Sequence, residues 1–233
     1  MAKISVLIPV YNEFAFVKND LESLLAWLDK NYAKQHELVI VENGSTDGTI
    51  EALHAAAKTH KQLKIYSLVE PSFGNAVRTA IMQATGEIGI LLNADWIDTD
   101  FIKAGALHCK TNDVVIGSKL LDPKLDSRPV VRKIASKSLT FLLQKVFNFE
   151  FSDSHGLKAF RLSKIKPIAK KCTLNEIFES ELLLRAQYAS LKITEIPVAI
   201  IETRSPRTSF FGRIFSMFRE LFTLHKISKR IKK

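Results

Sequence analysis

Three short polar segments of the sequence follow apolar stretches, and their side chains could bind a polar ligand. They are PVYNE at residues 9–13, ENGSTDG at 42–48 and NAD at 93–95. Each comes after a run of aliphatic residues that predicts a strand buried on both faces. Ligands of open α/β sheets bind beyond the carboxyl ends of the strands. We therefore expect the three segments to meet at one edge of a sheet and to form a binding site there.

Several common site motifs are missing. The sequence has no GxGxxG, no GK[ST] after GSTDGT and no HExxH, which excludes a dinucleotide-dependent dehydrogenase, a P-loop protein and an HExxH metalloprotease. The two cysteines, Cys109 and Cys172, fit neither a disulfide framework nor a zinc site. A reducing, cytoplasmic setting is therefore expected.

Alternating strands and helices must position the three polar segments. Strands are predicted at residues 3–10, 37–42, 63–69, 87–92, 114–119 and 191–201. Helices are predicted at residues 14–28, 49–59, 75–84, 101–109, 131–146 and 176–188. Asn12 and Asp47 are the expected caps of the first two helices. The order predicts an α/β fold with a mainly parallel sheet flanked by helices.

Charge is distributed unevenly along the 233 residues. The segment 204–233 holds nine Lys or Arg residues and one acid, whereas the remaining chain is close to neutral. We therefore predict one domain at 1–203 and a basic tail at 204–233. The tail residues at helical spacing form an apolar stripe: Phe211, Ile214, Phe215, Phe218, Leu221 and Phe222. This amphipathic helix has two alternatives, packing on the core or lying in an anionic membrane surface.

No secretory signal and no membrane-spanning stretch are expected from the sequence. The charged tail also raises the possibility of a nucleic-acid partner. Its aromatic residues are all phenylalanines at helical spacing, which suits an apolar face better than base stacking, so we expect no nucleic-acid binding.

A series of motifs, in order along the chain, resembles family 2 inverting glycosyltransferases with a GT-A (Rossmann-like) fold. The donor-side motifs are ISVLIPVYNE at 4–13, VIVENGSTDGT at 39–49, GNAVRT at 74–79 and LLNAD at 91–95. The second half is similar to the polyprenyl phosphate branch, which includes dolichyl phosphate mannose synthases. It carries GSK at 117–119, SDSHGLK at 152–158 and FESELLLRA at 178–186. The resemblance covers roughly residues 3–210 and implies a nucleotide-sugar half at 1–98 and an acceptor half at 99–203.

The resemblance also implies a donor site in the first half. It places Pro9, Tyr11 and Glu13 near the nucleotide base, and Glu42 against the base or the ribose. Arg78 faces the diphosphate or braces its loop.

Further roles implied by the resemblance concern the metal and the acceptor. Asp95 takes the second acidic position of the family's DXD metal motif, and Asn93 takes the first. Mg²⁺ or Mn²⁺ held there would neutralise the leaving diphosphate. Lys119 and Lys137 would grip the acceptor phosphate, and Asp153 joins them among the catalytic residues.

The sequence departs from the family pattern at several of these positions. Asn93 and Asn43 stand where relatives have acids, and Lys119 and Lys137 stand where relatives have arginines. A lysine retains the charge but loses the bidentate geometry of an arginine. Thr140 similarly replaces an asparagine.

Structural roles remain as alternatives at most site positions. Asp95 has an alternative as a helix cap, and the two lysines as solvated charges. Asp153 and Glu181 have alternatives as partners of Lys158 or of a backbone amide. His155 is interpreted as a structural histidine.

The expected function is glycosyl transfer with inversion, from a nucleotide diphosphate sugar to a lipid phosphate at the membrane surface. The protein would be cytoplasmic and attached to the membrane peripherally through its tail. A lipid phosphate is already an anion and needs no strong catalytic base. The alternative is a nucleotide-sugar-binding scaffold or regulatory subunit without activity, because of the substitutions at Asn93 and Asn43.

Overall fold

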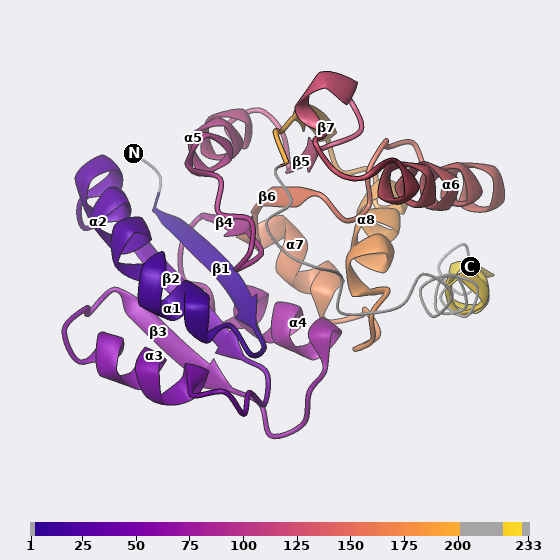
Figure 1. Cartoon of the computed structure of the whole chain (residues 1–233). Helices are drawn as coiled ribbons and strands as arrows, with labels where there is room; N and C mark the ends of the chain where they lie inside the picture. Colours follow the sequence, from indigo (N-terminus) through magenta and orange to yellow (C-terminus); the bar gives the residue numbers. More distant parts are fainter. Residues whose placement is uncertain (1–2, 201–220, 230–233) are drawn as a thin grey trace.

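A computed structural model describes residues 3–200 and 221–229 of the chain. Its central feature is a seven-stranded sheet in the order β3-β2-β1-β4-β6-β5-β7 (Figure 1). The strands are β1 (Ile4–Val10), β2 (His36–Glu42), β3 (Leu63–Ser67), β4 (Ile88–Leu91), β5 (Val114–Ser118), β6 (Leu157–Arg161) and β7 (Ile193–Pro197). Pairing is parallel except where β6 lies antiparallel between β4 and β5. The predicted α/β fold with a mainly parallel sheet is therefore confirmed.

Strand β1 lies between β2 and β4 in the sheet. It pairs with β2 from Ile4 opposite His36 to Val10 opposite Glu42, and with β4 on its other side. Its side chains alternate between the two faces, so that Leu7 packs into one apolar cluster and Val6 and Ile8 into the other. This double burial is the reason for the uninterrupted aliphatic run in the sequence.

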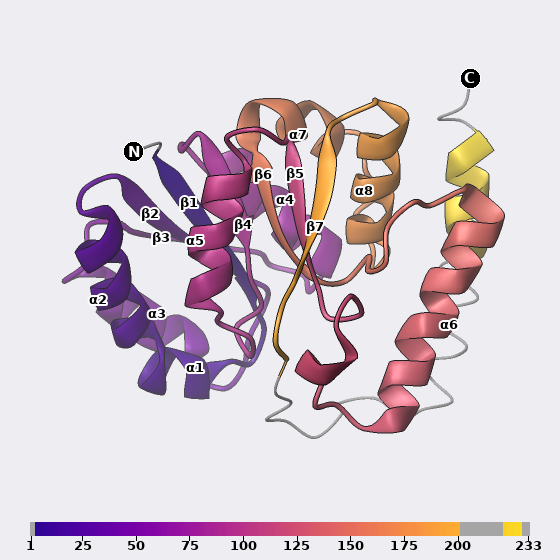
Figure 2. The same ribbon diagram turned by 90° about the horizontal axis from the view of Figure 1, so that it is seen from above.

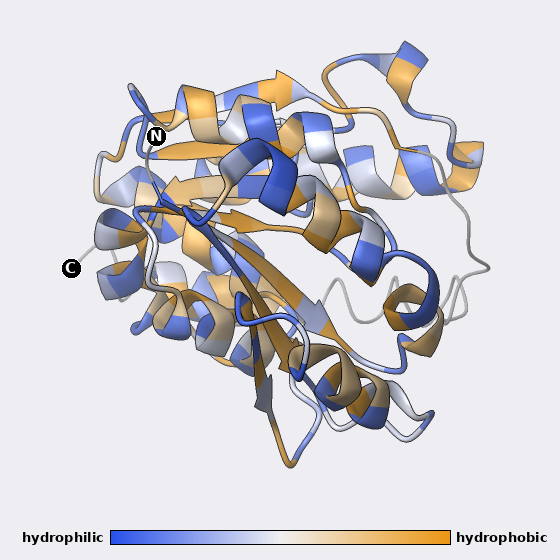
Figure 3. Cartoon of the chain, turned by 90° about the vertical axis from the view of Figure 1, so that its left-hand side faces the viewer, coloured by the Kyte–Doolittle hydropathy of each residue, from blue (hydrophilic) through white to orange (hydrophobic). Residues whose placement is uncertain are grey.

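Helices cover both faces of the sheet (Figures 1 and 2). One layer contains α1 (Phe14–Asn19), α2 (Leu21–Tyr32), α3 (Thr49–Ala57) and α5 (Thr99–His108). The other contains α4 (Phe73–Gln83), α6 (Val130–Phe147), α7 (Leu162–Ala169) and α8 (Phe178–Tyr188). A short 3₁₀ turn, Pro123–Leu125, precedes α6. Figure 3 shows that the strands are mostly apolar, whereas the helices mix polar and apolar residues.

The predicted single helix at 14–28 is wrong. The structure has two helices, α1 and α2, which meet at Asp20. Asn12 does not cap α1 as predicted, because its backbone has a positive φ of 53° and Glu13 takes the cap position. The chain turns before and within the predicted helix while still burying one apolar face.

The prediction missed β6 and α7. The strand contains Lys158, whose side chain is fully buried, and such a residue breaks the apolar pattern by which buried strands are recognised. Helix α7 contains Pro167, which weakens the helical signal. The remaining predicted strands and helices are present with modest differences at their ends.

The described part of the tail is a helix over residues 221–229. Leu224 and Ile227 are buried in the cluster that also holds α7 and α8, whereas Phe222 is exposed. The other members of the predicted stripe, Phe211, Ile214, Phe215 and Phe218, lie outside the described residues. Within 3–200 and 221–229, none of the helices has the length and apolar composition needed to cross a bilayer.

Candidate active site

The first two polar loops lock together at the carboxyl ends of β1 and β2. The Asn12 amide donates to Ser45 Oγ at 2.8 Å, and the Thr46 amide donates to Asn12 Oδ1 at 2.8 Å. The Glu13 amide donates to Thr49 Oγ1 at 2.9 Å. Positive φ at Asn12 lets its side chain reach across the gap. The predicted meeting of these loops is confirmed.

Asp47 fixes the start of two helices. Gly48, and not Asp47 as predicted, takes the cap position of α3, but Asp47 Oδ1 accepts the amide of Thr49, the first residue of that helix, at 3.1 Å. Asp47 Oδ2 accepts the amide of Phe14, the first residue of α1, at 3.2 Å. Burial acts to raise the pKa of Asp47, but these hydrogen bonds outweigh it and hold that pKa below its usual range. Asp47 is therefore part of the scaffold of the site.

The residues predicted to bind the nucleotide lie around this junction. Glu42 is buried at the end of β2, and its carboxylate accepts the Ser45 amide. Glu13 is buried as well, Pro9 is half-buried, and Tyr11 is exposed beside them. The loop 9–13 thus contributes an exposed aromatic side chain and a buried carboxylate to this edge of the sheet. Their contact with a nucleotide base stays a prediction.

Asn43 has a structural task. Its Oδ1 accepts the Ser72 amide at 2.7 Å, and Ser72 Oγ donates to the carbonyl oxygen of Leu174 at 2.5 Å. These bonds tie the loop after β2 to the start of α4 and to the segment before α8. Arg78 is half-buried on α4, close enough to Cys172 for its charge to act on that thiol. Both alternatives for Arg78 therefore stay predictions.

The third polar loop makes a tight turn after β4. The Trp96 amide donates to the carbonyl oxygen of Asn93 at 2.9 Å, which places Ala94 in the interior and Asp95 on the surface. The indole Nε1 of Trp96 donates to the carbonyl oxygen of Ala199 at 3.1 Å. The capping alternative for Asp95 is not realised, because Asp98 is the residue that caps α5.

The side chains of this turn suit a metal ion that is also bound by the phosphates of a substrate. Over the described ranges, no group of three His, Cys, Asp or Glu side chains could hold a metal. Asp95 and Asn93 offer one carboxylate and one amide oxygen. Mg²⁺ is commonly bound by one or two carboxylates together with substrate phosphates and water. The donor set therefore suits a divalent cation shared with a diphosphate.

Lys119 and Asp153 form a buried ion pair in the second half of the chain. Lys119 Nζ lies 2.6 Å from Asp153 Oδ2 and 5.9 Å from the centroid of the Trp96 ring. Asp153 Oδ1 accepts the His155 amide at 2.9 Å. Burial acts to raise the pKa of Asp153, but Lys119 outweighs it and holds that pKa below its usual range. The carboxylate is therefore ionised and already neutralised.

Two further buried ion pairs lie near enough for their cations to act on Lys119, and no sequence pattern indicated their acids. Lys158 Nζ lies 2.7 Å from Glu179 Oε1, and Arg128 binds Asp126 through two bonds of 2.9 Å each. Of the two structural alternatives for Glu181, the structure shows a backbone-amide partner and not Lys158. Glu181 accepts the amide and hydroxyl of Thr173 and binds Arg185.

Helix α6 connects to this cluster through its inner face. Thr140 Oγ1 donates to the carbonyl oxygen of Ser152 at 3.0 Å, next to Asp153, and Arg128 Nη1 donates to Ser136 Oγ at 3.2 Å. Lys137 is exposed on the same helix, and the structure does not bring it into the Lys119 pair. Of the two lysines predicted to bind the acceptor, Lys119 is buried and Lys137 is exposed.

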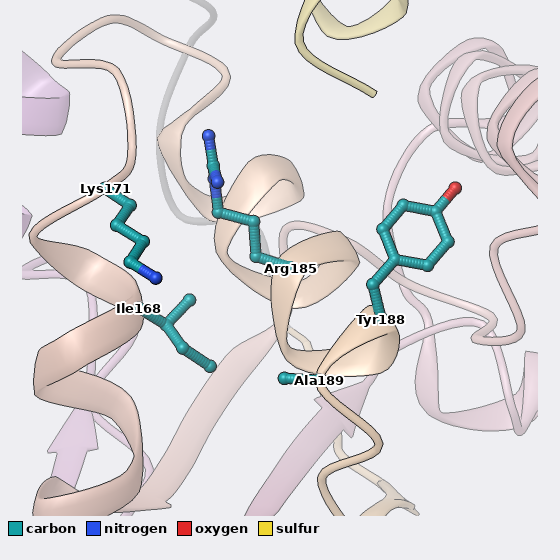
Figure 4. A pocket seen from close by; sticks show the side chains of 5 residues that line it. All are labelled: Ile168, Lys171, Arg185, Tyr188 and Ala189. Atoms are coloured by element: carbon teal, nitrogen blue, oxygen red, sulfur yellow. The ribbon is translucent and has the colours of Figure 1, made fainter. Parts of the chain in front are cut away.

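A pocket of about 180 Å³ lies away from these loops, between α7 and α8 (Figure 4). It is lined by Ile168, Lys171, Arg185, Tyr188 and Ala189. Arg185 is engaged by Glu181 at 2.7 Å, and the Tyr188 hydroxyl donates to the Phe147 carbonyl oxygen at 3.1 Å. These polar groups are used within the fold, so we do not assign the active site to this pocket.

The sequence decides the family. Residues 5–165, more than half of the chain, match glycosyl transferase family 2. The chain belongs to that family. This glycosyltransferase is 24% identical over 241 residues to a dolichyl-phosphate beta-glucosyltransferase of Drosophila melanogaster, covering 95% of this chain and 74% of the relative. It is 26% identical over 236 residues to a dolichol-phosphate mannosyltransferase of Pyrococcus furiosus, covering 96% and 64%.

Solved structures share the fold of this glycosyltransferase. One is the mannosyltransferase PcManGT of Pyrobaculum calidifontis in complex with GDP-Man and Mn²⁺, with a TM-score of 0.65 and 20% identity over 100% of this chain and 65% of that one. Another is the glucosyl-3-phosphoglycerate synthase of Mycobacterium tuberculosis in complex with Mn²⁺, UDP-Glc and phosphoglyceric acid. Its TM-score is 0.69, with 17% identity over 97% of this chain and 79% of that one. The predicted GT-A-type fold is confirmed.

Proposed function

We propose that this glycosyltransferase moves a sugar from a nucleotide diphosphate sugar to a lipid phosphate, with inversion at the anomeric carbon. The observation that carries the donor side is that the three polar loops follow β1, β2 and β4, which are adjacent parallel strands, with Glu42 buried and Asp95 exposed. The names of the two curated relatives, which act on dolichyl phosphate, support the acceptor class.

In this proposal Asp95 and Asn93 hold Mg²⁺ or Mn²⁺. The metal, when bound, neutralises the charge that develops on the leaving diphosphate. The loop 9–13 and Glu42 hold the nucleotide. A complete set of protein ligands is not needed, because the diphosphate itself supplies metal ligands.

Lys119 and Asp153 act on the acceptor side. Lys119 presents its ammonium group beside Trp96, and Asp153 holds it in position at 2.6 Å. The lipid phosphate is an anion and attacks without first losing a proton to a strong base. Lys137, exposed on α6, adds a second cation for the same phosphate. The protein works at the cytoplasmic face of a membrane, to which it is bound peripherally.

Transfer of radiolabelled sugar to a polyprenyl phosphate in detergent tests the function. A panel of UDP and GDP sugars with Mg²⁺ or Mn²⁺ should yield a lipid-linked product with at least one donor. The rival is a nucleotide-sugar-binding subunit without activity, which the neutral Asn93 favours. Donor binding in a thermal shift assay without any lipid-linked product would establish the rival instead.

A further inference from the structure

Helix α6 presents an apolar surface to solvent. Its inner face packs through Leu143 and Phe147, which are buried in the core cluster. Five large apolar side chains of the same helix are each between 51% and 68% exposed: Val130, Val131, Ile134, Phe141 and Val146. Clustered exposure of this kind on one element marks an interaction surface, whereas single exposed apolar residues need no explanation.

The exposed residues combine with lysines on one stripe. At the pitch of an α-helix, Val130, Ile134 and Phe141 fall with Lys137 and Lys145 within an arc of about 80°. Lys145 Nζ lies 5.7 Å from the centroid of the Phe141 ring. The stripe is therefore apolar along its length and carries ammonium groups among its apolar side chains.

The charge of α6 is entirely positive. Its 18 residues contain Arg132, Lys133, Lys137 and Lys145 and no acid. The helix over residues 221–229 lies beside α6, with His225 packed on Phe147 at a centroid distance of 6.4 Å (Figures 1 and 2). It repeats the pattern, because Phe222 is exposed and Lys226 Nζ lies 4.5 Å from its ring centroid.

The combination of apolar side chains and lysines on α6 distinguishes between possible binding partners. A second copy of the chain would bring two acid-free cationic helices together, which like-charge repulsion opposes. A nucleic acid would take the charges but would leave the aliphatic side chains in water. An anionic bilayer takes both, because apolar side chains enter the acyl region while lysines reach the headgroups.

We propose that the outward face of α6, the surface formed by Val130, Val131, Ile134, Phe141 and the lysines Lys137 and Lys145, docks on an anionic lipid bilayer. The helix lies in the plane of the interface and does not cross it. The inference places membrane contact on α6, whereas the described part of the tail uses Leu224 and Ile227 for packing on the core.

Docking by α6 would place the candidate active site at the membrane, a consequence that rests on the proposed function. The inner face of α6 is bound through Thr140 to Ser152 at 3.0 Å, and Asp153 follows directly. A surface held by α6 is therefore a short distance along the chain from the Lys119 pair. The docking itself does not depend on what reaction occurs there.

Vesicle sedimentation of the full chain tests the surface. The probe is phosphatidylcholine vesicles with and without phosphatidylserine. The double variant Ile134→Ser, Phe141→Ser should lose at least about tenfold in partitioning to the anionic vesicles. Leu107→Ser is the matched control, because Leu107 is 60% exposed on α5, in the opposite helix layer. It should bind as the unmodified chain does.

Two charge-reversal variants test the role of the lysines on α6. Lys145→Glu should reduce partitioning about tenfold at low salt and less at high salt. Lys103→Glu, an exposed lysine on α5, should change it little. Thermal unfolding of every variant should match the unmodified chain, because none of the changed side chains is buried.

Several results would overturn the proposal. They are absence of binding by the unmodified chain, unchanged binding by the double variant, and equal losses in the Leu107 control. A self-associating chain whose dimer is abolished by the α6 substitutions would assign the surface to a second copy. Transfer to a water-soluble short-chain lipid phosphate separates this proposal from the function. Vesicle binding without any such transfer would support membrane docking by α6 and refute the proposed reaction.

Discussion

Lys119 Nζ and Asp153 Oδ2 lie 2.6 Å apart with both side chains buried. The pair joins the end of β5 to the loop before β6, and the centroid of the Trp96 ring lies 5.9 Å from the ammonium nitrogen. Burying two charges is favourable only when each satisfies the other, so loss of either partner costs more than loss of both. The two residues therefore act as one unit in the site.

Substitution of Lys119 should separate binding of the two substrates. We expect Lys119→Gln to raise the KM for the lipid phosphate far more than the KM for the donor, because a charged hydrogen bond is worth about 1.5 to 3 kcal/mol. It should also lower the free energy of unfolding by about 3 kcal/mol, since Asp153 is left unpaired. Steady-state kinetics with each substrate varied, and urea unfolding, give both values.

Lys137 provides the comparison for Lys119. Because Lys137 is exposed, Lys137→Gln should leave the free energy of unfolding within about 0.5 kcal/mol of the unmodified value. Its effect on the KM for the lipid phosphate should nevertheless exceed its effect on the KM for the donor. Equal effects on the two KM values would contradict an acceptor role for either lysine.

Asp95 should control metal-dependent donor binding. We expect Asp95→Ala to abolish the Mn²⁺-dependent part of nucleotide diphosphate binding, measured by calorimetry, without changing thermal unfolding, because Asp95 is exposed. Asn93→Asp restores a carboxylate and should preserve or strengthen that binding. Full metal-dependent binding by Asp95→Ala would show that the cation is held elsewhere.

The stability of the fold should depend on pH through Glu37. Burial acts to raise the pKa of this carboxyl, but Lys64 at 2.5 Å, Ser5 and Thr85 outweigh it and lower that pKa to about 2. A lowered pKa in the folded state adds stability above pH 4.5 that is lost as the pH falls toward 2. The full contribution is on the order of 3 kcal/mol.

Glu37→Gln tests this dependence. The variant should unfold more easily at pH 7, and its stability should fall less between pH 4.5 and 2 than that of the unmodified chain. Urea unfolding at a series of pH values measures the difference. Parallel curves for the two proteins would assign the acid sensitivity to other carboxylates.

Gly156 should tolerate no side chain. A Cβ at this position would lie 2.1 Å from the carbonyl oxygen of Gly117, in backbone that cannot withdraw because β5 and β6 are paired there. We expect Gly156→Ala to destabilise the protein by about 3 kcal/mol and to displace the loop that carries Asp153. Thermal unfolding checks the first effect. A fully stable variant would mean that β5 and β6 separate locally.

The first half of the chain could be predicted from the sequence because its strands are uninterrupted aliphatic runs. The polar loops of the candidate site follow those strands directly. Leu7 and Val39 point into one cluster while their neighbours point into the other, and that arrangement leaves a plain pattern. The meeting of the loops then follows from parallel topology. The interlocking bonds of Asn12 with Ser45 and Thr46 required three-dimensional coordinates.

The second half of the chain was less predictable because the sequence pattern does not show which of its charged residues are buried or which of them pair. Lys158 reads as a surface residue until Glu179, 21 positions later, is placed 2.7 Å from it. Arg128 likewise gives no sign that it is buried against Asp126. The family motifs located Lys119 and Asp153, but periodicity could not show that they bind each other.

The antiparallel strand β6 has a consequence for the way the chain is made. Strands β3, β2, β1 and β4 are all synthesised before residue 92 and are neighbours in the sheet, whereas β4 pairs on its other side with residues 157–161. Until the ribosome has added those residues, the nascent chain carries an apolar sheet edge at β4 with no partner. Such an edge invites pairing with other chains. The interval between the synthesis of β4 and that of β6 is therefore the stage at which the unfinished sheet is most open to pairing with other chains.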